Sequence, residues 1–261
     1  MNKLVRERDG AVERWSLNNP ANRNALDEEI VDGLLTACAD ATKDPSLRFV
    51  VLTGRGGAFC AGGDLGGLAA LVGQPLPAGE IDPLLAMNMR FGDLLHALSA
   101  LPQWLVAAVD GPAMAGGLGL VCCADVVVAT PRASFATPEL TLGIAPAQIA
   151  PFVWRRLGPR IARQCLLQAC RYSAAEAQAI GLVDEIAEDL GAAVAALMLR
   201  LRATAPDAVA ATKRLLKTLD LHAVKDLRIE GARAFAASLR SPEAAEGLAA
   251  FARKRTPRWA E

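Results

Sequence analysis

The chain has 261 residues, of which 52% are apolar and 21% charged, so it can bury a substantial core. Its 28 basic and 28 acidic residues balance, which argues against nucleic acid or an anionic membrane surface as a partner. No apolar run approaches the roughly 20 residues that cross a bilayer, and the N-terminus lacks the apolar segment of a signal peptide, so we expect a cytoplasmic protein with no membrane partner.

The first part of the chain alternates strand and helix patterns. Residues 4–17 alternate around Asp9 and Gly10, which predicts a β-hairpin. Asp27 precedes apolar residues at helical spacing and is expected to cap an amphipathic helix. Residues 48–54, RFVVLTG, predict a buried strand that runs into the glycine-rich loop GRGGAFCAGGDLGG.

The rest of the chain changes from mixed to helical patterns. A helix is expected over about 84–100 and a buried strand over 104–111, and DVVVAT and ASFAT follow as further strands. From about residue 147 the pattern is mostly helical, with one short strand at LVDEIA. We therefore predict an α/β core over 1–190 and a helical region over 191–261.

Cysteine and histidine usage restricts the chemistry. The six cysteines lie in apolar surroundings without CxxC spacing, which predicts reduced, buried thiols and no metal site. The chain has only two histidines, His96 and His222, and no G-x-S-x-G elbow, which disfavours a Ser-His-Asp hydrolase. The usual dinucleotide and nucleotide phosphate loops do not occur either. Any chemistry should therefore use carboxylates and backbone groups.

Two segments share one arrangement, in which a buried strand leads through glycines into the start of a helix. They are VVLTGRGGAFCAGGDL and VAAVDGPAMAGGLGL. Each glycine inside a helix costs up to about 1 kcal/mol relative to alanine, so close packing or the approach of a ligand must compensate. N–H groups at such turns are unpaired, and two that converge on one oxygen form an oxyanion hole. We predict that the two segments meet at such a site.

Three motifs carry a family resemblance. FCAGGDL at 59–65, DGPAMAGGLGL at 110–120 and PELTLGIAP at 138–146 resemble, in order and spacing, motifs of the crotonase (enoyl-CoA hydratase/isomerase) superfamily. The resemblance covers nearly the whole chain. It implies a β-β-α spiral core with C-terminal helices used in assembly, and hence a homotrimer or a dimer of trimers. It also implies an acyl-CoA substrate and no cofactor beyond the coenzyme A of that substrate.

The resemblance also assigns residues to the site. It implies that the N–H groups of Ala61 and Gly116 hold the thioester oxygen and that Glu139 is the catalytic carboxylate. An ordinary surface turn would explain the first loop, NNPANRNAL, equally well. The residues implied to bind substrate are Arg23, Ala25, Gly62, Gly63, Asp64, Leu65, Gly117, Gly119 and Gln148.

The number of carboxylates leaves the reaction open. Hydratases of the family commonly use two glutamates, and the first of these falls on Gly119 here. A single carboxylate can activate water and then protonate Cα if both additions occur on one face, and an isomerase proton shuttle also needs only one. We expect a hydratase, with an enoyl-CoA isomerase or a non-catalytic acyl-CoA-binding member as alternatives.

The resemblance suggests a substrate type as well. GGLGLVCCAD and GIAPAQIAPFVWRRLG are more similar to bacterial methylglutaconyl-CoA and isohexenylglutaconyl-CoA hydratases, of leucine and acyclic terpene breakdown, than to straight-chain hydratases. Met87, Met89 and Phe91 are candidates to line an acyl pocket, or else ordinary helix core. Arg90 or Gln148 would face the free carboxylate of a glutaconyl group. RNA binding, associated with one branch of the superfamily, is disfavoured by the neutral net charge.

Overall fold

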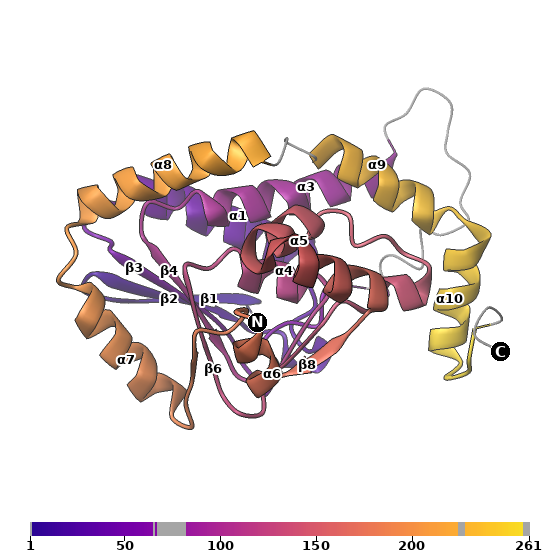
Figure 1. Cartoon of the computed structure of the whole chain (residues 1–261), viewed down its shortest axis with the longest axis horizontal. Helices are drawn as coiled ribbons and strands as arrows, with labels where there is room; N and C mark the ends of the chain where they lie inside the picture. The colour runs from indigo at the N-terminus through magenta and orange to yellow at the C-terminus, as the bar shows by residue number, and fades with distance from the viewer. Residues whose placement is uncertain (1, 65, 67–81, 224–227, 258–261) are drawn as a thin grey trace.

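The structure is a computed structural model that describes residues 2–64, 66, 82–223 and 228–257 (Figure 1). The predicted hairpin is present: β1 (Leu4–Asp9) and β2 (Val12–Leu17) are antiparallel, and Gly10 adopts a φ of 53° in the turn between them. A positive φ is readily available to glycine, so the turn forms where the sequence places it.

The hairpin forms one edge of a six-stranded sheet with the order β1-β2-β3-β4-β6-β9. After the antiparallel first pair, every neighbouring pair is parallel. The further strands are β3 (Phe49–Gly54), β4 (Trp104–Val109), β6 (Val126–Ala129) and β9 (Glu185–Ile186). Parallel strands that are covered on both faces consist of continuous apolar residues. For this reason these parallel strands could be predicted from the sequence.

A smaller sheet carries the segments that lead to the glycine-rich helix. It has the order β5-β7-β8, with β5 and β7 parallel and β8 antiparallel to β7. Its strands are β5 (Pro112–Met114), β7 (Ser134–Ala136) and β8 (Arg171–Ser173). The sequence analysis predicted only β7, which lies within the longer segment ASFAT, whereas the three residues of β5 and of β8 are too few to show an alternating pattern.

Helices cover the large sheet and complete the core. Asp27 caps α1 as predicted, with its Oδ1 accepting a hydrogen bond from the N–H of Ile30 at 3.0 Å. Apolar residues of α1, α3 and α4 pack with the inward face of the sheet in one continuous core. The helices of this part are α1 (Glu28–Lys43), α3 (Pro83–Ser99), α4 (Gly116–Cys122), α5 (Ala150–Gln168) and α6 (Ala174–Ala179), with the 3-10 turns η1 (Pro20–Asn22) and η2 (Pro138–Leu142).

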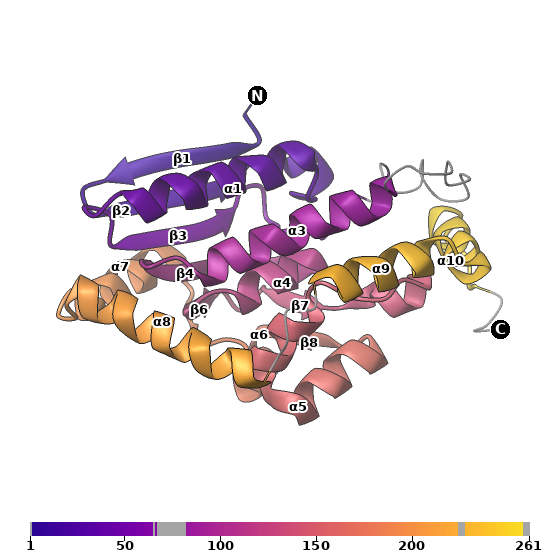
Figure 2. The same ribbon diagram turned by 90° about the horizontal axis from the view of Figure 1, so that it is seen from above.

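The C-terminal part consists of helices, and no strand follows β9 among the described residues. These helices are α7 (Leu190–Leu201), α8 (Pro206–Ala223), α9 (Arg228–Leu239) and α10 (Pro242–Ala252). Val194 and Leu197 of α7 pack on the second face of the sheet against Val106. Helix α9 packs along α3, as Figure 2 shows, and α10 contacts η2. The C-terminal helices therefore flank the elements that form the site.

Three further expectations concern the whole chain. Five of the six cysteines are buried free thiols, as predicted, whereas Cys170 is half-buried. Among the described residues no group of three or more His, Cys, Asp or Glu side chains is placed to hold a metal ion. None of the helices in the described part of the chain has the length and apolar character needed to cross a membrane.

Candidate active site

The two glycine-rich segments meet directly after β3 and β4. The N–H groups of Phe59 and Cys60 both donate to the Pro112 carbonyl, at 3.0 and 3.1 Å, and the Met114 N–H donates to the Cys60 carbonyl at 2.9 Å. These bonds form a short parallel bridge between Cys60 and Ala113. The predicted meeting of the two segments is therefore present in the fold.

Beyond this bridge, Gly62 and Gly116 lie against each other. Gly62 has a φ of 91°, and a Cβ there would lie 2.7 Å from the Cβ of Ala115 and 3.4 Å from the amide nitrogen of Gly116. Both the backbone conformation and the close approach exclude a larger residue. Glycine at Gly62 thus allows the two chain segments to come together.

The N–H of Gly116, the first predicted donor, is free among the described residues. Ala115 adopts φ 50° and ψ −119°, and its N–H donates to the Ala136 carbonyl at 2.8 Å. Gly116 is the first residue of α4, and its N–H makes no hydrogen bond within the described residues. Helix-terminal N–H groups lack partners inside the helix, so this one is available to a ligand oxygen.

The structure contradicts the assignment of the second donor to Ala61. The Ala61 N–H donates to the Arg23 carbonyl at 3.0 Å and is not available to a ligand. Leu26 donates to the Gly62 carbonyl at 2.7 Å and accepts from the Asp64 N–H at 3.2 Å. A residue between two such bonds has its own N–H on the opposite side.

Gly63 is the residue between these two bonds. Its N–H has no hydrogen-bond partner in the described part of the chain. It directly follows Gly62, whose Cα lies 3.7 Å from the Cβ position of Gly116. The Gly63 N–H is therefore the free donor that can act together with the Gly116 N–H on one oxygen. It lies two residues after Ala61, the donor predicted from the sequence.

The loop that contains Arg23 and Ala25 lies beside these glycines, as predicted. The exposed Arg23 is left-handed, with φ 48°, and Ala25 is buried. The sequence analysis did not identify Asn24, whose fully buried Nδ2 donates to the carbonyls of Arg55 and Ala58 at 2.9 and 2.8 Å. Asparagine tolerates the left-handed region, here with φ 57°, and this preference was the available signal.

Asp64 and Leu65 complete the predicted loop. The Oδ1 of Asp64 accepts a hydrogen bond from the Gly66 N–H at 3.1 Å, so this carboxylate stabilises a local turn. Leu65 lies outside the described residues.

Glu139 has the properties expected of an acid–base group. It lies in η2, three residues after Ala136. The Ala136 carbonyl accepts the hydrogen bond from the N–H of Ala115, the residue before Gly116. Its Oε2 is buried and has no hydrogen-bond partner among the described residues. Burial raises the pKa of Glu139 to about 7, against a smaller lowering by its own backbone N–H. Such a carboxyl can accept and donate a proton near neutral pH.

Gly117 and Gly119, which were predicted to contact substrate, allow close packing in the structure. A Cβ at Gly117 would lie 2.5 Å from the carbonyl oxygen of Cys60. A Cβ at Gly119 would overlap the Cγ2 of Ile149, whose side chain is buried. The position to which the resemblance assigns the first glutamate is therefore filled by an isoleucine from the start of α5.

This packing predicts the effect of restoring a carboxylate at Gly119. Because Ile149 occupies the space next to Gly119, Gly119→Glu should lower the free energy of unfolding by about 1–3 kcal/mol through overpacking. The double variant Gly119→Glu/Ile149→Ala should recover part of the loss, as measured by urea unfolding. Ile149→Ala alone is the control, with an expected loss of about 2–5 kcal/mol from the cavity. A Gly119→Glu variant as stable as the wild type would contradict the assigned contact.

Phe91 is the acyl-pocket candidate that reaches the site. A Cβ at Gly116 would lie 3.1 Å from both the Cζ of Phe91 and the Cδ1 of Leu26, so these two side chains flank the free N–H. Met87 is 43% exposed on α3, and Met89 is half-buried. The aromatic ring and Leu26 thus form an apolar wall beside Gly116.

The two candidates for binding a distal carboxylate are engaged elsewhere. Arg90 forms an exposed ion pair with Asp32 of α1 at 2.6 Å. The Nε2 of the buried Gln148 donates to the Arg228 carbonyl at 3.0 Å, and its amide packs against Gly92. Gln148 thus connects α3 and α9, and the structure assigns both residues to contacts between helices.

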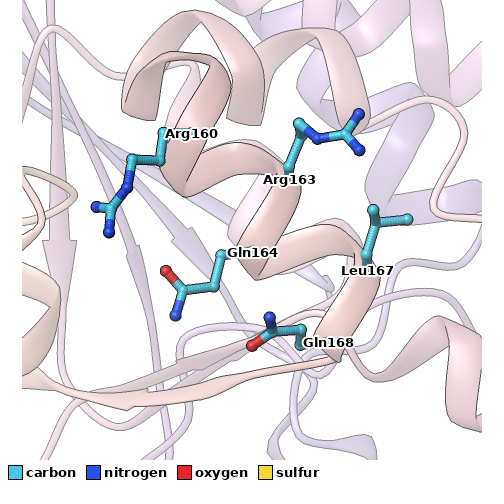
Figure 3. Close-up of a pocket in the computed structure, with 5 residues that line it drawn as sticks. All are labelled: Arg160, Arg163, Gln164, Leu167 and Gln168. Carbon is cyan, nitrogen blue, oxygen red and sulfur yellow. The ribbon is translucent and has the colours of Figure 1, made fainter.

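Two surface hollows lie apart from this meeting point. One, of about 450 Å³, lies on the surface of α5 (Figure 3). The other, also about 450 Å³, lies between η2 and α10 and includes Leu140, Thr141 and Leu142, directly after Glu139. The residues that line the first are Arg160, Arg163, Gln164, Leu167 and Gln168. The first contains none of the predicted site residues, so the glycine loops and Glu139 remain the candidate site.

Comparison with known proteins gives matches along the entire chain. The family described as enoyl-CoA hydratase/isomerase matches residues 7–261. The 2,3-dehydroadipyl-CoA hydratase of Escherichia coli is 32% identical over 98% of this chain and 98% of its own. The crystal structure of an enoyl-CoA hydratase/isomerase from Marinobacter aquaeolei is 39% identical, with 100% of both chains covered and a TM-score of 0.80. That of an enoyl-CoA hydratase from Mycobacterium avium is 34% identical, with 98% of each chain covered and a TM-score of 0.86.

Proposed function

Because the chain belongs to the enoyl-CoA hydratase/isomerase family and is an enzyme of hydratase type, we propose that it hydrates an enoyl-CoA with Glu139 as its only catalytic carboxylate. The predicted crotonase-type α/β fold with C-terminal helices is confirmed by the solved structures that it matches. The observation that carries the proposal is the buried, unpaired Oε2 of Glu139, on the loop that follows β7.

In this proposal the backbone polarises the thioester and Glu139 moves the protons. The N–H groups of Gly63 and Gly116 hold the thioester oxygen, on which negative charge develops as water adds to Cβ. Glu139 takes one proton from the water and then delivers it to Cα, so its carboxylate is regenerated after each turnover. The mechanism requires no cofactor beyond the coenzyme A of the substrate.

The two alternatives to a hydratase predict different outcomes for an enoyl-CoA substrate. An isomerase would use the same carboxylate to move a proton between Cα and Cγ, and a non-catalytic member would bind acyl-CoA without turnover. A buried carboxyl oxygen without a hydrogen-bond partner among the described residues carries a cost in stability, which is difficult to explain in a member that only binds. The hydratase names of the relatives also favour water addition.

For the substrate, we propose a branched enoyl-CoA, with methylglutaconyl-CoA and isohexenylglutaconyl-CoA as the first candidates. The proposal is supported by the segments GGLGLVCCAD and GIAPAQIAPFVWRRLG. Since Arg90 and Gln148 are engaged in helix contacts, a free carboxylate on the substrate would need other partners. The apolar wall of Phe91 and Leu26 suits the branch itself.

A substrate panel combined with a pH profile tests the proposed function. With crotonyl-, methylglutaconyl- and isohexenylglutaconyl-CoA, we expect 3-hydroxyacyl products and the highest kcat/KM for a branched substrate. The profile should show one acid limb, in which kcat/KM falls as pH drops below about 7, because only the deprotonated Glu139 activates water. A 3-enoyl product would favour the isomerase, and no turnover would favour the binding protein.

We also propose that the protein assembles as a homotrimer or a dimer of trimers. Large apolar side chains are exposed on α5 and on the C-terminal helices, where a partner subunit would cover them. They are Trp154, Leu167, Leu199, Leu215, Leu216, Ile229 and Phe251.

A further inference from the structure

Helix α3 carries a buried amide whose oxygen has no hydrogen-bond partner among the described residues. Asn88 is 6% exposed, and its Oδ1 has no hydrogen-bond partner in the described part of the chain. Almost all buried polar side chains in proteins are hydrogen-bonded, so an amide that is not calls for a water or a ligand. Helix core packing alone would be served better by leucine at this position.

The neighbours of Asn88 on α3 locate it at the site. Leu84, Asn88 and Phe91 are spaced so that they lie on one face of the helix. On one side of Asn88, Phe91 reaches to 3.1 Å from the Cβ position of Gly116, which carries the free N–H.

On its other side, Asn88 is one turn from Leu84. Leu84 packs with Leu142 and Ile144, and the Ile144 N–H donates to the Glu139 carbonyl at 3.0 Å. Asn88 therefore lies on α3 between the residue that contacts the oxyanion turn and the residue that packs beside the Glu139 loop. Asn88 Oδ1 and Glu139 Oε2 are both buried oxygens without a hydrogen-bond partner among the described residues.

We propose that the amide of Asn88 holds the water that adds to the substrate, in place of the second carboxylate that Gly119 cannot supply. The inference rests on the proposed hydratase function of Glu139. Asn88 Oδ1 accepts a hydrogen bond from one O–H of the water, and Glu139 takes the other proton. The water oxygen bonds to Cβ, and the electron pair of the C=C bond moves through Cα toward the thioester oxygen. Cα then takes the proton from Glu139, so the product gains one water and nothing else.

Asn88→Leu tests this role because it replaces the amide by an apolar side chain of similar size. We expect hydration kcat to fall at least tenfold while the melting temperature stays equal or rises. The exchange of Cα protons of a saturated acyl-CoA into D₂O needs only Glu139 and the backbone donors, so it should stay within about threefold of wild type. Asn88→Asp keeps the acceptor oxygen and should retain more hydration than Asn88→Leu.

Gln103→Leu is the matched control. Gln103 is also a buried amide with an unpaired Oε1, but it lies just before β4, at the end of the strand away from the glycine turns. Its loss should leave hydration unchanged. If Asn88→Leu does not fold, Asn88→Ala is assayed in the same way.

The outcomes separate the two proposals. Normal hydration by Asn88→Leu, or an equal loss of hydration and Cα exchange, would overturn the role of Asn88. If Glu139→Gln retains both reactions, the proposed function fails instead, whatever the result at Asn88.

Discussion

Glu139→Gln is expected to lower kcat for hydration by about 10² to 10⁴, the range that general acid–base catalysis contributes. Glutamine keeps the shape of the side chain but cannot exchange a proton, so both the activation of water and the protonation of Cα are lost. Binding of acyl-CoA should change little, because the free N–H groups of Gly63 and Gly116 belong to the backbone. Turnover and equilibrium binding of a saturated acyl-CoA measure the two effects separately.

The same variant tests the burial of the carboxyl without reference to activity. The pKa of Glu139 is raised from 4.5 to about 7 in the folded protein, so its contribution to stability is full below pH 4.5 and is lost as pH rises through 7. Glu139→Gln should therefore match the wild type at pH 4 or below and be the more stable of the two at pH 8. Glu188→Gln, on an exposed carboxylate, is the control for both measurements. Near-normal hydration by Glu139→Gln would refute the assigned role.

Gly116→Pro is expected to lower kcat by about 10² to 10³, the loss measured when one oxyanion donor is removed. Proline has no N–H, and it is tolerated at the first position of a helix, where Gly116 lies. Gly116→Ala is the control that keeps the N–H, although its Cβ would lie 3.1 Å from Phe91 and Leu26. It should therefore lose much less activity than Gly116→Pro.

Circular dichroism and thermal unfolding should establish that Gly116→Pro is folded, since Ala115 before it adopts an unusual φ of 50°. A folded Gly116→Pro variant with wild-type turnover would exclude Gly116 as a donor. The corresponding variant Gly63→Pro should lose activity to a similar extent. If Ala61→Pro has that effect on kcat and Gly63→Pro does not, the donor predicted from the sequence would be restored.

The sequence by itself determined the parts of the protein that depend on local patterns. The hairpin around Gly10, the cap at Asp27 and the buried strands β3 and β4 follow from turn chemistry, side-chain capping and apolar runs, each of which lies within a few neighbouring residues. The three motifs were sufficient to identify the family, and from the resemblance they led to the prediction of Glu139 and Gly116 as site residues.

Tertiary structure decided which groups remain available for chemistry. Whether Ala61 or Gly63 offers a free N–H depends on hydrogen bonds to Arg23 and Leu26, more than thirty residues earlier in the chain, and the motif itself contains no information about that pairing. Likewise, only the packing shows that Ile149 fills the space at Gly119. The direction of an amide and the volume beside a glycine are set by partners distant in sequence, so a pattern of neighbouring residues cannot specify them.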